Sequence, residues 1–209
     1  MPARPAFYVN EVLAGQGAVA LQQGDILARV PFPTFNLQAA NIVRAGRPIN
    51  VDFTSESTVE AEDYLLSTFQ VYPALIITQT CDLERGDRPV LVCAIRPYHE
   101  IFKDQEIGSS GFLKRIKEFS NPGRKPNMLP LPPFTGWETL NMYSIADFGL
   151  VTNIAAPNRS SLLEARRARL SVEALSLLQE RLTSNFGRFA ANEGIFLSDQ
   201  DFAKAKAGK

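Results

Sequence analysis

The sequence predicts an α+β fold, in which short strands curl into a small β-barrel and a helix packs against it near the C-terminus. Apolar, β-branched runs alternate with turns rich in proline and glycine, which is typical of small barrels. A stripe of leucine and phenylalanine at helical spacing follows within residues 171–191. We expect a single domain over residues 1–209, with the barrel core at about 22–155 and a mobile tail at about 203–209.

The composition is that of an ordinary globular protein. The 209 residues include 22 basic and 22 acidic side chains, so the formal net charge is zero. This balance argues against a positive field over the whole surface, but it allows a local basic groove. No run approaches about 20 consecutive apolar residues, so we expect no membrane span. The N-terminus lacks the apolar core of a secretory signal, and we therefore expect a cytoplasmic protein.

The first strand is expected at residues 24–33, where a Gly-Asp turn leads into an apolar run that prolines bring to an end. Residues 34–48 have the character of a loop. Residues 48–53 alternate between apolar and polar side chains, which predicts a half-buried strand.

The most informative pattern is a predicted β-hairpin with strands at residues 73–80 and 88–96. The first apolar run ends in Thr-Gln-Thr-Cys-Asp, and the second begins after a polar stretch that contains Gly86. Two such runs predict antiparallel strands. With the turn near Gly86, Cys81 and Cys93 would not lie opposite each other, so we expect two reduced thiols, as in a cytoplasmic protein.

Four further elements complete the expected fold. Phenylalanines and an isoleucine at helical spacing predict a helix over residues 110–119. The proline-rich residues 128–134 suit an extended edge. Residues 142–154 predict a strand that is broken near Asp147 and Gly149. The C-terminal helix of residues 171–191 begins with Ser171 as its cap.

Three features of the sequence, here called landmarks, together form a recognisable pattern. They are a turn at Gly24-Asp25-Ile26 before a strand that runs into two prolines, an aromatic residue and a proline at the start of the strand Pro73–Thr78, and the following strand Val90–Ile95. In order and spacing they resemble the PemK/MazF-like toxins, most of all an uncharacterised, phage- or mobile-element-associated branch. The resemblance implies an SH3-like barrel and a metal-independent endoribonuclease without cofactors, which cuts single-stranded RNA by attack of the 2′-hydroxyl. It also implies a toxin–antitoxin or phage-defence setting, with an antitoxin as partner.

The chain departs from the toxins at two positions of that pattern. Tyr72 stands where the toxins have an arginine, and Arg96-Pro97 stands where they have a serine or threonine. Two functions therefore stay open, an RNA-directed barrel protein with or without cleavage, and a non-catalytic barrel that acts as a protein-interaction or regulatory module.

Four arginines are candidates for holding phosphate, because a guanidinium binds phosphate with two parallel hydrogen bonds. If the protein cleaves RNA, we expect the developing negative charge to be stabilised by Arg29, Arg85 or Arg96, with Arg88 as a binding residue. The alternative is that these arginines face water or pair with nearby carboxylates. Antiparallel strands would place Arg96 at the Tyr72 end and Arg85 at the turn, so these two cannot share one phosphate.

The polar end of the hairpin offers a second group of candidates. Gln79, Thr80 and Asp82 are predicted to form a polar binding pocket, although Asp82 equally suits a turn. A thiol-dependent hydrolase would need His99 beside Cys81. A straight strand would separate these two by roughly 30 Å, so a packed thiol is the favoured interpretation.

The helix at residues 110–119 carries three cations, Lys114, Arg115 and Lys117, beside two phenylalanines. This composition is compatible with a nucleic-acid face or with an ordinary solvated surface. One histidine and two cysteines do not predict a zinc site. The apolar C-terminal stripe is compatible with the core or with a homodimer interface.

Overall fold

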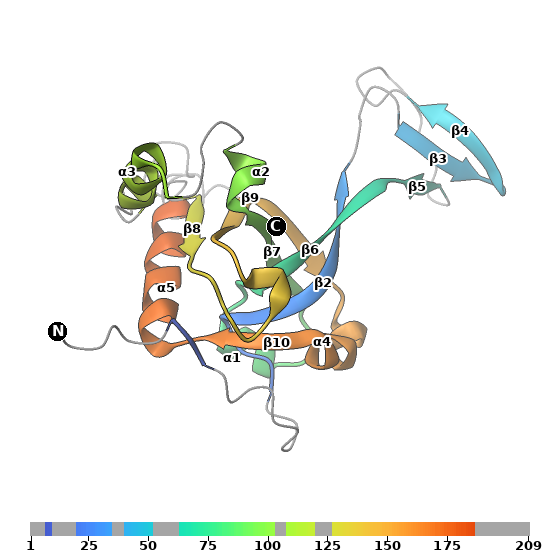
Figure 1. The fold of residues 1–209 in the computed structure, drawn as a ribbon. Coiled ribbons are helices and arrows are strands. Elements are labelled where there is room, and N and C mark those ends of the chain that lie inside the picture. Colours follow the sequence, from blue (N-terminus) through green and yellow to red (C-terminus); the bar gives the residue numbers. More distant parts are fainter. Residues whose placement is uncertain are drawn as a thin grey trace, which may run out of the picture.

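The computed structural model describes residues 7–9, 20–34, 40–51, 63–102, 108–119 and 127–186. These residues form a mixed α+β fold, in which a curled antiparallel sheet makes a half-barrel with five α-helices around it (Figure 1). The predicted α+β class is therefore confirmed. None of the helices in these ranges is long and apolar enough to cross a membrane.

The main sheet has seven strands in the order β1-β10-β2-β6-β7-β9-β8, and every neighbouring pair is antiparallel. The strands are Tyr8–Val9 (β1), Asp25–Thr34 (β2), Thr68–Ile76 (β6), Val90–Pro97 (β7), Met128–Leu131 (β8), Ser144–Ile154 (β9) and Arg166–Leu170 (β10).

The helices are Thr80–Glu84 (α1), Tyr98–Ile101 (α2), Ser110–Phe119 (α3), Arg159–Ala165 (α4) and Val172–Phe186 (α5). Short 3₁₀ turns lie at Glu138–Leu140 and Ala156–Asn158. A second sheet has the order β4-β3-β5, with Ala40–Arg44 (β3), Arg47–Val51 (β4) and Tyr64–Leu66 (β5). Figure 1 shows this small sheet beyond the half-barrel, at the far ends of β2 and β6.

Both faces of the main sheet are covered, because successive residues of a strand point to opposite sides. On one face, Leu75 and Cys93 belong to a cluster that includes Leu178 of α5. On the other face, Ala74 and Val92 belong to a cluster that includes side chains of α1 and α4. Residues 74–76 of β6 and residues 92–95 of β7 are therefore buried from both sides, which explains their continuous apolar sequences.

The predicted hairpin is correct in its pairing and wrong in its connection. Residues of β6 and β7 pair as antiparallel neighbours, with Leu75 opposite Cys93. The first strand, however, ends at Ile76, and Thr80–Glu84 form α1 instead of the predicted strand end and turn. The reason is a tertiary contact, because Leu83 is buried in the second cluster and holds one helical turn against the sheet.

The region of residues 24–51 differs from the prediction in two ways. Strand β2 continues through Pro31 and Pro33. Both prolines lie beyond the residues of β2 that pair with β10, so on that side of the strand no pairing requires the N–H group that proline lacks. Residues 40–44 are not a loop but β3, which forms a hairpin with β4. Ala45 and Gly46 both have positive φ in its two-residue turn, as a type I′ turn requires.

The other predicted elements are confirmed where the structure describes them. Helix α3 has the predicted bounds, and β8 is an edge strand. Strand β9 is interrupted as expected, because the residues that pair with Cys93 and Ala94 are Val151 and Asp147. The Oγ of Ser171 accepts a hydrogen bond from the amide of Ala174, so it caps α5. Residues 187–191 of the predicted helix and the tail at 203–209 lie outside the described residues.

Candidate functional site

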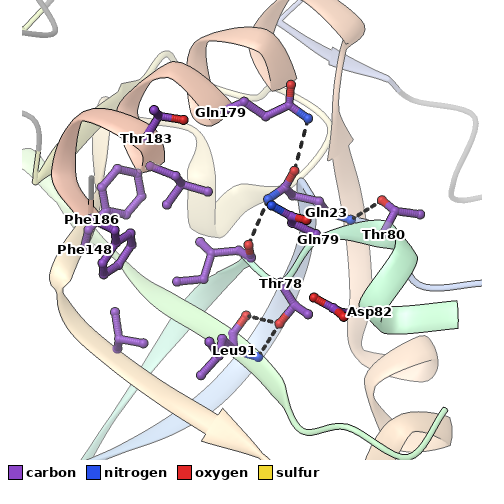
Figure 2. Close-up of a pocket in the computed structure, with 13 residues that line it drawn as sticks. Gln23, Thr78, Gln79, Thr80, Asp82, Leu91, Phe148, Gln179, Thr183 and Phe186 are labelled. Atoms are coloured by element: carbon purple, nitrogen blue, oxygen red, sulfur yellow. Dashed lines mark hydrogen bonds between the residues drawn. The ribbon is translucent and has the colours of Figure 1, made fainter. Parts of the chain in front are cut away.

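A cleft of about 1030 Å³ opens where β6 ends, between α1 and α5 (Figure 2). One part of its wall is polar, with side chains from the turn before β2, from the end of β6, from α1 and from α5: Gln23, Thr78, Gln79, Thr80, Asp82 and Gln179. The other part is apolar and includes Ile77, Leu91, Phe148, Leu182 and Phe186. The predicted polar pocket of Gln79, Thr80 and Asp82 therefore coincides with a cleft of the structure.

Thr78 is the first residue of the polar wall after the end of β6, and it ends the backbone pairing between β6 and β7. Its Oγ1 accepts a hydrogen bond from the amide of Leu91 at 2.6 Å, in place of a backbone carbonyl. Its own amide still donates to the carbonyl of Leu91, at 3.4 Å. Since a side chain now occupies the position of the strand backbone, the chain can leave the sheet and turn into α1.

Gln23 joins three parts of the cleft, and it is almost completely buried. Its Nε2 donates to the carbonyl of Ile77 at 2.9 Å, and its Oε1 accepts from Nε2 of Gln179 at 3.2 Å (Figure 2). Its backbone amide donates to Oγ1 of Thr80 at 3.3 Å. These contacts fix the positions of α1 and α5 relative to each other, so the cleft between them is preformed.

Two arginines, here called the rim arginines, pair with Asp82, which lines the cleft, without lining it themselves. Oδ1 of Asp82 is 3.3 Å from Nη1 of Arg88 and 3.8 Å from Nη1 of Arg85. Both arginine side chains are more than half exposed, so these ion pairs contribute little to stability. The pairs hold two guanidinium groups at one place while leaving most of their surface open to a phosphate.

The other arginines of the predicted site lie elsewhere. The guanidinium of Arg96 is 5.9 Å from the ring centroid of Tyr72, and its Nη1 is 3.3 Å from Oδ2 of Asp147. The expected separation of Arg96 from Arg85 is thus confirmed. Arg29 is exposed on β2, and no described residue of that strand lines the cleft. Of the three predicted catalytic arginines, the structure places Arg85 alone at the cleft rim.

The two cysteines are free thiols, as predicted, and they have different surroundings. Cys81 is exposed in α1, whereas His99 lies in α2, which follows the opposite end of β7. Cys93 is fully buried in the sheet, and burial together with the carboxylate of Asp147 raises its pKa. The arrangement therefore gives no support to a thiol-dependent reaction.

The cations of α3 form a separate feature of the surface. Lys114 and Lys117 are exposed, and the guanidinium of Arg115 lies 4.7 Å from the ring centroid of Phe102. The apolar side of the helix is buried through Phe112 and Phe119, as its spacing predicts. None of these residues lines the cleft.

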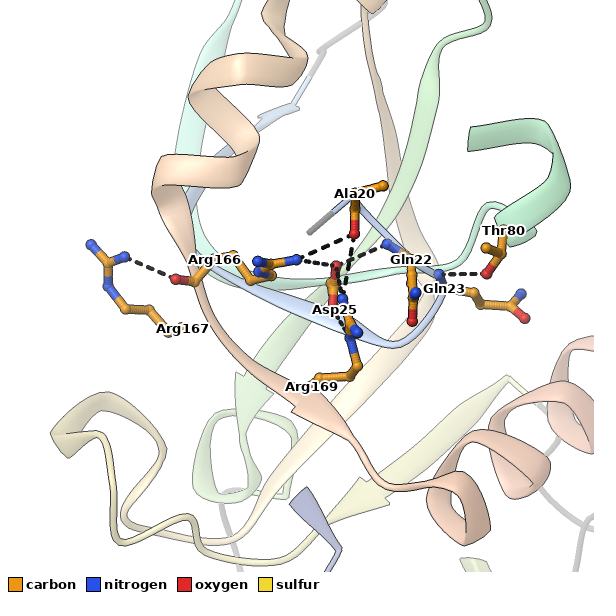
Figure 3. A network of polar contacts seen from close by, with 8 residues as sticks. All are labelled: Ala20, Gln22, Gln23, Asp25, Thr80, Arg166, Arg167 and Arg169. Atoms are coloured by element: carbon orange, nitrogen blue, oxygen red, sulfur yellow. Dashed lines mark hydrogen bonds and ion pairs between the residues drawn. The ribbon is translucent and has the colours of Figure 1, made fainter. Parts of the chain in front are cut away.

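A polar network behind the cleft was not predicted from the sequence (Figure 3). Asp25 is fully buried, and its carboxylate accepts hydrogen bonds from Nε of Arg169 at 2.5 Å and from Nη1 of Arg166 at 3.3 Å. It also accepts from the amide of Gln22 at 2.9 Å, which fixes the turn that carries Gln23 into the cleft. The sequence signal that could have indicated the network is an acidic residue, Asp25, at the start of the apolar run of β2, together with the arginines of β10.

Gln23, Gln179 and Phe186 were also missing from the predicted site. They come from the segments before β2 and within α5, and sequence separation alone gives no indication that these segments meet. Within the ranges that the structure describes, no group of three histidine, cysteine or acidic side chains is arranged to hold a metal ion.

No protein-family model matches this chain, and a search of curated proteins finds no significant relative. The PemK/MazF-like resemblance therefore stays a prediction that rests on the three sequence landmarks.

Proposed function

We propose that this protein binds single-stranded nucleic acid, RNA in particular, in the cleft between α1 and α5. The observation that carries the proposal is the meeting of three kinds of group at one place. The hydrogen-bonding side chains of Gln79 and Thr80 line one wall of the cleft and an exposed aromatic ring, Phe186, lines the opposite wall. Arg85 and Arg88 pair with Asp82 of the same cleft. Stacking, base-edge hydrogen bonds and phosphate contacts are the interactions by which proteins hold unpaired nucleotides.

Each group has a distinct role in the proposed complex. The ring of Phe186 is 48% exposed and offers a stacking surface for a base. The Gln79 amide can both donate to and accept from a base edge. Arg85 and Arg88 bind phosphates at the rim, where Asp82 keeps their guanidinium groups together. The volume, about 1030 Å³, lies at the upper end of the range for small-molecule sites and suits one or two nucleotides.

We further propose that the curled sheet is an SH3-like barrel of the PemK/MazF-like kind. The antiparallel β6–β7 pair and the strand that opens at Asp25 support this, because all three sequence landmarks then lie on neighbouring strands of one sheet. The toxin–antitoxin or mobile-element setting, with an antitoxin as partner, rests on the sequence resemblance alone.

Binding is the proposed function, and cleavage is tested alongside it. Attack by a 2′-hydroxyl needs a proton acceptor and a cation at the same phosphate. Asp82 and Arg85 are the groups at the rim that could serve, whereas Arg29 and Arg96 lie away from it. Asp82 is already paired with Arg85 and Arg88, and this favours binding over cleavage.

The test is fluorescence anisotropy with labelled single-stranded RNA of about 12 nucleotides, in EDTA. We expect the double variant Arg85→Ala/Arg88→Ala to bind at least about tenfold more weakly, a loss of about 1.4 kcal/mol. Phe186→Ala should weaken binding as well. The control is Arg47→Ala, which removes an exposed arginine from β4, outside the half-barrel, and should leave the affinity unchanged.

Equal affinity of the cleft variants and the wild type would overturn the proposal, and so would a folded protein that binds no RNA. The latter result would favour the non-catalytic protein-interaction module. The same samples, analysed for their RNA termini, show whether cleavage occurs, because discrete products with 2′,3′-cyclic phosphates would establish a metal-independent nuclease.

A further inference from the structure

The segment of residues 64–72, here called the arm edge, is an exposed strand of unusual composition. It comprises β5, Ser67 and the first half of β6, with the sequence Tyr-Leu-Leu-Ser-Thr-Phe-Gln-Val-Tyr. It contains no charged residue and no proline. Residues 64–71 are all exposed, including Tyr64 at 73% and Phe69 at 63%. Large apolar side chains of this kind rarely stay in water without a function.

One side of the arm edge has no strand partner among the described residues. Strand β5 is the outer strand of the small sheet, with β3 as its neighbour. Strand β6 pairs with β2 from Thr68 onward, but its pairing with β7 is confined to Ala74–Ile76. Figure 1 shows β2 and β6 running together from the half-barrel toward the small sheet. Within the part of the chain that the structure describes, backbone N–H and C=O groups on this side of the arm edge therefore have no strand partner.

Other outer strands of this chain carry the protection that natural edges usually have. The outer strand of the small sheet on its other side, β4, begins with Arg47 and Pro48. In the main sheet, β8 contains Pro130, and β1 consists of only two residues. The arm edge is nine residues long and contains neither a charged residue nor a proline, so it lacks the features that protect the other outer strands from strand pairing.

We infer that the arm edge binds the arm edge of a second copy of this chain, as an antiparallel pair of strands around a twofold axis. An open strand edge requires an extended strand as its occupant. The sequence is matched about Thr68 at its outer positions, because an antiparallel pair places Tyr64 opposite Tyr72 and Leu65 opposite Val71 of the partner. The inner positions pair Leu66 with Gln70 and Ser67 with Phe69. Each copy presents the same surface, as a twofold interface demands, and no charge opposes a like charge.

The pairing also explains how the small sheet is stabilised. Three strands are near the minimum for an independently stable sheet. Joining two arm edges converts two small sheets into one continuous sheet and removes both open edges. Nine paired residues extend over about 30 Å, which gives the interface the length of a full strand pair.

The test is the molar mass of the full-length protein in solution, measured by light scattering and sedimentation over a range of concentrations. We expect a species of twice the 23.1 kDa chain mass. The double variant Phe69→Lys/Val71→Lys replaces two apolar side chains of the paired edge by lysines, with position 69 two residues along the strand from its own symmetry mate and position 71 opposite Leu65, and should shift the protein to the monomer. Leu113→Lys is the matched control, because it changes an equally exposed apolar residue of α3 and should leave the dimer intact.

A crosslink tests the register without disturbing the charge. In a Cys81→Ser background, Thr68→Cys lies at the proposed twofold axis and should form an intermolecular disulfide on mild oxidation, whereas Leu113→Cys should not. Circular dichroism checks that each variant is folded. The RNA affinity of the lysine variant should equal that of the wild type, since the arm edge does not line the cleft.

Three results would overturn the inference. The wild type could be monomeric at every concentration, or it could form a dimer that the Phe69→Lys/Val71→Lys variant retains. A monomer that instead captures an unrelated peptide strand would also contradict a second copy as the occupant. None of these results bears on RNA binding in the cleft, so the two proposals fail or survive separately.

Discussion

The carboxylate of Asp25 occupies a fully buried position, yet its neighbours are charged. Arg166 and Arg169 of β10 bind it, and the amide of Gln22 completes its surroundings. A buried carboxylate is tolerated only when it is paired in this manner, and removal of one partner leaves the others uncompensated. Because the turn at Gln22 also carries Gln23, the network connects the strand order of the sheet to the position of the cleft.

We expect Asp25→Ala to lower the free energy of unfolding by about 3 kcal/mol, since two arginines then lose their buried partner. The measurement is urea unfolding followed by circular dichroism. Asp87→Ala is the control, because it removes an exposed carboxylate from the loop after α1 and should cost less than about 0.5 kcal/mol. Similar losses in the two variants would show that the network does not stabilise the fold.

At the scale of single elements, the sequence predicts those that carry their own signal. Helix α3 is recognisable because its phenylalanines repeat at helical spacing, and the paired parts of β6 and β7 because residues 74–76 and 90–95 are continuous apolar runs. Helix α1 and β10 were not recognised. Helix α1 is one turn held by a buried leucine, and the arginines of β10 are satisfied by Asp25 of another strand. Such elements depend on tertiary contacts that no local pattern shows.

Helix α5 offers a direct test of which face packs on the sheet. Leu178 is completely buried, whereas its neighbour Leu177 is 47% exposed. We expect Leu178→Ala to destabilise the protein by about 3 kcal/mol, through lost burial and the cavity left behind. Leu177→Ala, the matched control, should cost under about 1 kcal/mol. Thermal unfolding of both variants provides the comparison, and a reversed order would contradict the described orientation of α5.

At the scale of the whole molecule, the candidate site was half predictable. One wall of the site is visible in the sequence, because a polar run that follows an apolar strand contains Gln79, Thr80, Asp82, Arg85 and Arg88. The opposite wall comes from α5, and Gln179 is 156 residues from its partner Gln23. A single sequence does not predict the contact between the segment of Gln23 and α5, because neither segment carries a pattern that identifies the other.

The zero net charge makes a prediction about salt. Attraction between RNA and this protein must come from local cations, since the chain as a whole provides no positive field. If Arg85 and Arg88 each neutralise one phosphate, the logarithm of the affinity should fall against the logarithm of salt concentration with a slope of about −1.4. Anisotropy titrations in increasing KCl measure this slope. A much steeper slope would indicate that the cations of α3 also contact the RNA.

The place of β10 between β1 and β2 has a consequence for how the chain folds. A strand from the last quarter of the sequence must pair with two strands from its beginning. Such distant contacts slow folding, because a long loop closes before they form. On the ribosome, the N-terminal strands must wait until residues 166–170 have left the exit tunnel. The cleft is then completed last, when α5 meets Gln23, so an interrupted translation product would lack the binding site altogether.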